Sequence, residues 1–445
     1  MTIATAVGGV LANLTAQRDG FDPAWLTEAR LAALGWVGEH GFPTDKDEDW
    51  KYTRLDPILT VPFEAAAAES GRDPSRPISA EMIEEVAVDL GGIRLVFVNG
   101  HLVSELSRLT GLPAGAEVTN LSAVLATRPE RLEPFFTHPA GEHHAFAAFN
   151  DALAEDGAFV HLAAGTTVDK PIHFVFFSDT GGSPLMSSPR SVIMAEPGSS
   201  ATIVETYAGI EGDVYCTNAV TEFILADGAK IEHYKVQVEP LSAFHLALLT
   251  VRQGRDSQFS SRSVMLGANI ARHEVRVLLE NVRAEVSLDG IYLPQGDQLH
   301  DNMIFVDHAA ANCTSHQLYK GVLDGRGHGV FNGHIMVRPG ADGTDANQKN
   351  KNLLLSDRAE VDTRPRLEIY TDDVKCTHGA AVGQLDDEAL LYLRSRGLPL
   401  DAARGLLIYA FVHEMVDRIE LEPLRAQLET LVAGRFGKGD PPVEP

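Results

Sequence analysis

The sequence predicts a mainly β fold in which a β-solenoid core lies between helical N- and C-terminal segments. Short β-type runs broken by Gly, Asp, Asn and Pro fill residues 93–382. A corner of small residues followed by an alternating strand recurs at residues 197–203, 227–233 and 266–272, as stacked coils require. Helical spacing of apolar residues is largely confined to the two ends. Because the corners are unevenly spaced, the pattern alone also allows a pair of twisted sandwiches.

The elements divide the chain into four parts. Residues 1–92 form a helical N-terminal domain with a linker; its best-marked helix starts near Asp22 and ends before Gly41. Residues 93–384 form the β core, with an α-like patch at 121–154. Residues 385–436 return to helix, and residues 437–445 form a flexible tail.

The C-terminal part shows the clearest helix boundaries. Asp386 is placed to cap a short helix, and Gly397 follows its end. A longer amphipathic helix then begins at Asp401. Its apolar residues, spaced four apart, are Leu407, Phe411, Met415 and Ile419. Such a face must be buried against something.

Composition excludes several classes of function. The 445 residues include 62 Asp and Glu against 37 Lys and Arg, which gives a net charge of −25. This charge repels phosphate backbones and anionic lipid, so neither nucleic acid nor a membrane is an expected partner. The longest strongly apolar run of helical character, residues 405–412, is far shorter than the ~20 residues of a membrane span. No basic region precedes the first apolar stretch, so we expect a cytoplasmic protein without a secretory signal.

Thiol and imidazole groups gather late in the β region. Cys376 and His378 are two residues apart, so on a strand both side chains face the same way. Cys313 and His316 form a second, looser pair. These groups ligate iron, zinc and iron–sulfur clusters, but neither pair completes a site. From the chemistry alone, the alternative to a metal site is that these histidines are structural residues with ordinary hydrogen bonds. A catalytic Cys–His nucleophile is a weaker interpretation, because no third residue that would orient the pair can be located.

Nucleotide-binding motifs are absent from the sequence. The glycine-rich segment 325–329 matches neither GxGxxG at the start of a helix nor GxxxxGK[ST], so we interpret it as a turn between strands.

Four longer segments carry a family resemblance. They are GVFNGHIMVRPG at 329–340, TDANQKNKNLLLS at 344–356, RPRLEIYTDDVKCTHG at 364–379 and DWKYT at 49–53. Together they resemble the SufB/SufD family of iron–sulfur cluster assembly proteins. Gly379 stands where the SufB branch has Glu after its Cys-Ser-His segment, and clustered N-terminal cysteines are missing, so the chain is more similar to the SufD branch.

The resemblance implies a right-handed parallel β-helix flanked by helical domains and a non-catalytic scaffold in a SufBCD complex. The implied partners are a SufB-like paralogue, which pairs through the β-helix, and a SufC-like ATPase, which hydrolyses the ATP and docks on the C-terminal helices through Leu407, Phe411, Met415 and Ile419. His378 and Cys376 would lie at the interface with the paralogue and contact iron or a cluster transiently. The isolated chain is expected to hold no cofactor; flavin binding stays open.

Two other functions compete with this hypothesis. A β-helical carbohydrate-active enzyme would need clustered carboxylates along one face and usually acts outside the cell. A purely structural homodimer would use the same β-helix edge without a paralogue.

Overall fold

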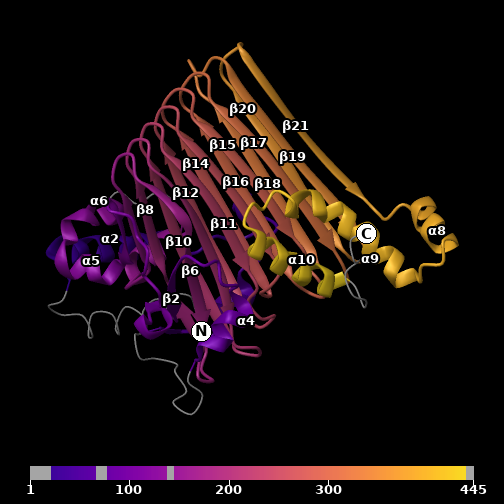
Figure 1. Ribbon diagram of the computed structural model, residues 1–445, viewed down its shortest axis with the longest axis horizontal. Coiled ribbons are helices and arrows are strands. Elements are labelled where there is room, and N and C mark those ends of the chain that lie inside the picture. Colours follow the sequence, from indigo (N-terminus) through magenta and orange to yellow (C-terminus); the bar gives the residue numbers. More distant parts are fainter. Residues whose placement is uncertain (1–21, 67–77, 138–144, 437–445) are drawn as a thin grey trace.

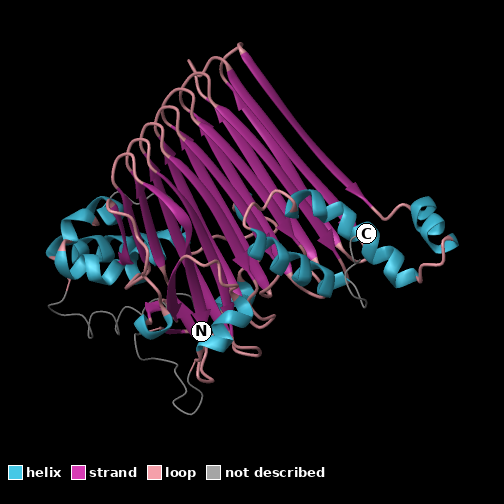
Figure 2. Cartoon of the chain, in the orientation of Figure 1, coloured by secondary structure: helices cyan, strands magenta, loops and turns pink. Residues whose placement is uncertain are grey.

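The computed structural model describes residues 22–66, 78–137 and 145–436. Two long sheets of mostly parallel strands face each other and form a flattened solenoid, with helices at its N-terminal end and along one side (Figures 1 and 2). From β8 onward successive strands alternate between the sheets, so each strand pairs with the strand two places later in the sequence. This pairing confirms the β-solenoid and excludes the pair of sandwiches.

The two sheets are named sheet A and sheet B. Sheet A contains β4 (Ala116–Asn120), β5 (Ala158–Leu162), β8 (Arg190–Ala195), β10 (Tyr215–Leu225), β12 (Phe244–Gln253), β14 (Ile270–Leu279), β16 (Leu299–His308), β18 (His328–Val337) and β20 (Glu360–Ile369). The short β7 (Leu185–Ser187) pairs with β10, and β1 (Glu64–Ala65) pairs with β7. Sheet B contains β3 (His101–Leu102), β2 (Ile93–Val98), β6 (Thr167–Ser178), β9 (Ser200–Gly209), β11 (Lys230–Gln237), β13 (Gln258–Met265), β15 (Glu285–Tyr292), β17 (Thr314–Leu323), β19 (Thr344–Leu354) and β21 (Val374–Gly383).

Helices cover the N-terminal end of the solenoid. Two separate stretches of the chain supply them: α2 (Ala24–His40) comes before the first strands, and α5 (Leu121–Thr127), α6 (Glu133–Thr137) and α7 (Ala145–Leu153) lie between β4 and β5. Apolar side chains of α2, α5 and α6 pack together and onto Phe159 and Val192 of sheet A, and α7 packs on α2 through Phe149 and Leu153. The shorter helices α3 (Asp56–Leu59) and α4 (Ala80–Val86) come between α2 and β2 in the sequence. Residues 1–21 and 67–77 of the expected N-terminal domain and linker, and the expected tail at 437–445, lie outside the described residues.

Three helices complete the chain: α8 (Asp387–Ser395), α9 (Leu400–Val416) and α10 (Glu422–Phe436). Helices α9 and α10 pack on the outer face of sheet B, where Ile408, Val412 and Leu428 meet Val264 and Ile291. None of the described helices is long and apolar enough to span a bilayer.

The solenoid itself covers part of the expected docking face, and binding of a partner by the C-terminal helices stays a prediction. Met415 and Ile419 are buried in the same contact with sheet B, and Phe411 packs beside them, because the solenoid itself supplies the partner for this face. Leu407 is half-buried. A partner protein would therefore meet other side chains of the C-terminal helices; the exposed apolar residues there are Leu391, Tyr392 and Leu400.

A ladder of left-handed residues forms one corner of the coils. The backbone N–H of each corner residue donates to a carbonyl of the next coil, as Gly198 does to Asp227 (3.0 Å) and Gly228 does to Arg255 (2.7 Å). The φ angles at this corner are positive throughout; the residues are Gly165, Gly198, Gly228, Asp256, Arg283, Asn312 and Gly343. The third repeat seen in the sequence, at 266–272, belongs to the opposite corner, which explains the uneven spacing.

Gly228→Ala is expected to destabilise the protein by about 1–2 kcal/mol, measured as a shift in the urea unfolding midpoint. A Cβ at this position has room, since its nearest neighbours lie 3.9 Å away or more, so the cost comes from the left-handed backbone alone. Gly228→Asn is the matched control and should cost less, because Asn tolerates this conformation. Equal losses for the two variants would contradict this explanation.

Candidate functional site

The terminal coil, formed by β20 and β21, is the uncovered end of the solenoid. Within the described residues, each of these strands is the last of its sheet. Every residue in both strands is at least partly exposed, whereas the strands before them are mostly buried. Unlike the opposite end, where antiparallel strands and helices close the solenoid, this end presents unpaired backbone groups (Figure 1).

Cys376 and His378 lie on β21 and face the interior of the coil. Cys376 is in register with Ala346 and packs against a small cluster that includes Ile335 and Val337. His378, two residues later, points the same way and is exposed. Burial raises the pKa of the Cys376 thiol. The structure therefore brings the two predicted residues to one face of an open rim.

Polar side chains fill the interior directly beneath this rim. His378 is in register with Gln348, whose Nε2 donates to Oε1 of Gln317 on the next strand (2.9 Å). In the same layer Asn350 Nδ2 donates to the hydroxyl of Tyr292 (3.0 Å). Gln348 and Asn350 belong to the polar run at 344–352, which forms most of β19.

The room for these amides comes from two glycines, Gly333 on β18 of the facing sheet and Gly321 on the neighbouring strand β17. A Cβ on Gly333 would lie 2.2 Å from Nε2 of Gln348, and one on Gly321 would lie 2.4 Å from Oδ1 of Asn352. The amide layer therefore depends on two glycines that accept no side chain, and it forms a hydrogen-bonded part of the base of the terminal coil, beside the apolar cluster at Ile335 and Val337.

The other histidines and cysteines of the late β strands are dispersed. His300 and His308 are buried and hydrogen-bonded, to the Gly267 carbonyl (2.9 Å) and to Ser315 Oγ (2.8 Å). Cys313 is buried, while His316 is exposed on the outer face of β17, so that pair does not meet. Cys376 and His378 have no third potential metal ligand beside them within the described residues.

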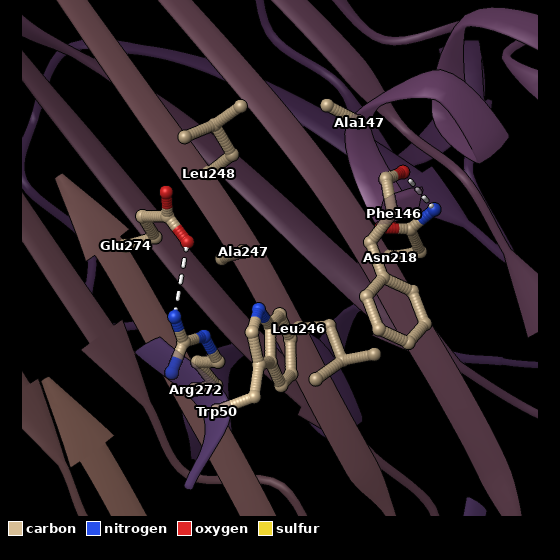
Figure 3. A pocket seen from close by; sticks show the side chains of 9 residues that line it. All are labelled: Trp50, Phe146, Ala147, Asn218, Leu246, Ala247, Leu248, Arg272 and Glu274. Carbon is tan, nitrogen blue, oxygen red and sulfur yellow. Dashed lines mark hydrogen bonds and ion pairs between the residues drawn. The ribbon is translucent and has the colours of Figure 1, made fainter. Parts of the chain in front are cut away.

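The DWKYT segment at 49–53 has a structural role that the sequence did not reveal. It crosses the outer face of sheet A, where the Arg272 guanidinium lies 3.9 Å from the centre of the Trp50 ring and donates to the Asp49 carbonyl (3.0 Å). Figure 3 shows Trp50, Arg272 and Glu274 in this contact. The Thr53 hydroxyl donates to Asp301 (2.5 Å), so the N-terminal segment is fixed to the late coils of the solenoid.

Comparison with known proteins places these features in a family. Residues 176–411 match the family described as "SUF system FeS cluster assembly, SufBD core domain", and residues 19–174 match the SufBD protein N-terminal region. The chain is 30% identical to the iron–sulfur cluster assembly protein SufD of Escherichia coli, over 90% of each chain. It is 27% identical to SufD of Bacillus subtilis, over 92% of this chain and 94% of that one.

A SufBD family iron–sulfur cluster assembly protein of Synechocystis is 30% identical, over 94% of this chain and 92% of its own length. The matches extend from the N-terminal helices through the solenoid to α9, and therefore include the terminal coil. The chain belongs to the SufBD family of iron–sulfur cluster assembly proteins.

Proposed function

We propose that this chain is the SufD-type scaffold of an assembly complex and that it pairs with a SufB-like paralogue through the terminal coil. The uncovered end of the solenoid is the observation that carries the proposal. Two parallel strands with free outer edges, above a hydrogen-bonded base, offer a surface that a second solenoid can extend by strand pairing. A SufC-like ATPase would dock on the C-terminal helices, through α8 and the start of α9.

Cys376 and His378 would supply part of an iron or cluster site in that assembly. A thiol and an imidazole on one face are two suitable ligands, and the paralogue would provide the others. In this role iron or the cluster is cargo rather than a resident cofactor, and ATP hydrolysis belongs to the partner.

Val382→Asp tests the pairing surface. Val382 lies on β21 and is 49% exposed, so a charge there does not disrupt the core of the isolated chain but would be buried in the paired assembly. We expect co-purification with the SufB-like protein to be lost. Leu241→Asp is the control and should pair normally. Leu241 is an apolar side chain, 57% exposed, in the turn between β11 and β12 and outside the terminal coil. Normal pairing by Val382→Asp would reject the terminal coil as the interface.

His378→Ala tests the iron site in complexes purified without oxygen. The complex should assemble as in the wild type, while its iron content falls by at least half, since one of few ligands is lost. His316→Ala, which removes an exposed histidine from the outer face of β17, should keep its iron. If the iron content of the His378→Ala complex equals that of the wild type, His378 is not an iron ligand. A wild-type chain that forms only dimers with itself and ignores the paralogue would instead favour the structural homodimer.

A further inference from the structure

Three potential metal ligands converge at the start of two neighbouring strands of sheet A. His328 begins β18 and is in register with Glu360, which begins β20. Asp362 follows two residues later on the same face. The ligand atoms of the three side chains all lie within 4.8 Å of one another, and His328 Nε2 is 2.8 Å from Asp362 Oδ2.

The charge around this cluster sets it apart from the rest of the sheet. Carboxylates elsewhere on the outer face of sheet A are paired with arginine: Asp301 with Arg272, and Asp307 with Arg338 at 2.5 Å. For Glu360 and Asp362, no ion pair with Lys or Arg occurs in the part of the chain that the structure describes; Asp362 meets only the imidazole. Two carboxylates therefore converge on one histidine without a fixed cation to balance them.

The geometry points to a binding site for a divalent first-row transition metal ion at His328, Glu360 and Asp362. One imidazole nitrogen and two carboxylate oxygens are a donor set for Fe²⁺, Mn²⁺, Co²⁺ or Zn²⁺, whereas Ca²⁺ and Mg²⁺ prefer oxygen alone. Metal–ligand bonds of about 2.0–2.2 Å require the three ligand atoms to move closer to one another, and small rotations of the two carboxylates achieve this. Glu360 is exposed and the other two side chains are half-buried, so the ion can enter from solvent and keep water ligands.

This site is separate from Cys376 and His378. The three ligands lie on the outer face of sheet A, at the start of β18 and β20, whereas Cys376 and His378 face the interior of the coil from β21 of sheet B. The inference needs neither the paralogue nor the proposed function, because all three ligands come from this chain.

Titration with Co²⁺ alone tests the inference, on the full-length chain without a polyhistidine tag. To remove the other candidate ligands, every protein carries Cys376→Ser and His378→Ala. Calorimetry and the visible absorption of bound Co²⁺ report affinity and coordination. We expect His328→Gln, Glu360→Gln and Asp362→Asn each to weaken the tightest Co²⁺ binding at least about tenfold, as the loss of a ligand does. Unchanged affinity in all three variants would overturn the proposal.

Two controls separate coordination from general effects of the substitutions. His316→Gln removes an exposed histidine, and Asp297→Asn removes an exposed carboxylate that is paired with Arg326; neither should change the tightest binding. In a second measurement, Fe²⁺ with ascorbate and air oxidises side chains near the bound ion, and mass spectrometry locates them. Oxidation at His328 that Zn²⁺ suppresses would support the site, and oxidation confined to other histidines would overturn it.

Discussion

Replacing Arg190 by leucine is expected to destabilise the protein by about 3–5 kcal/mol, the largest loss we predict for a single side chain. Arg190 is 1% exposed and lies between two buried carboxylates, Asp151 of α7 and Glu222 of β10. Its Nη2 also donates to the Phe135 carbonyl of α6 (2.7 Å). Burial raises the pKa of both carboxyls in spite of the guanidinium. Without the Arg190 guanidinium, the two buried carboxylates lose their counter-ion and α6 loses a hydrogen bond to sheet A.

Two comparisons test this explanation, with the urea unfolding midpoint as the measurement. Arg326→Leu removes an arginine whose ion pair with Asp297 is exposed, and we expect a loss below about 1 kcal/mol. Adding Asp151→Asn and Glu222→Gln to Arg190→Leu should recover part of the stability, because the orphaned charges are then removed. If the triple variant is less stable than Arg190→Leu, the loss stems from packing rather than from the buried charges.

The sequence predicted those features that depend on near neighbours along the chain. Asp386 caps α8 by accepting from the backbone N–H groups of Glu388 and Ala389, and Gly397 after the helix has a φ of +95°. Cys376 and His378 share a face because side chains alternate along any strand. The solenoid itself was visible because small residues recur at several of its corners, as at Gly198 and Gly228.

The features that sequence did not predict depend on the lengths of the coils. From β9 to β21, register partners on neighbouring strands of sheet B are 27–31 residues apart, and this variation hides which side chains stack. His328 and Glu360 become neighbours only once their register is known. The contact of Thr53 with Asp301 joins residues 248 positions apart. For α9 the apolar spacing correctly required a buried face, but spacing carries no information about what covers it, and sheet B covers Met415.

Lowering the pH from 7.5 to 5.5 is expected to cost about 1.4 kcal/mol of stability for each of three buried histidines. Burial lowers the pKa of His173 and His300 to about 3 and that of His308 to about 4. An unfolded histidine has a pKa near 6.5, so between these pH values the unfolded chain takes up protons and the folded chain does not. Stability is therefore present at neutral pH and falls as the medium becomes more acidic, and urea midpoints across this range measure it.

His300→Gln isolates one of these contributions. Glutamine stays neutral and offers an N–H to the Gly267 carbonyl, which His300 contacts at 2.9 Å, so the variant should lose about 1.4 kcal/mol less than the wild type over the same range. Buried carboxyls with raised pKa values, such as Asp301, act in the opposite direction, but they are common to both proteins and cancel in the difference. His316→Gln is the control: this side chain stays in water when the chain folds, so the pH dependence should match the wild type. An equal pH dependence in all three proteins would mean that His300 takes up its proton without unfolding, by opening the corner of the coil at Gly267.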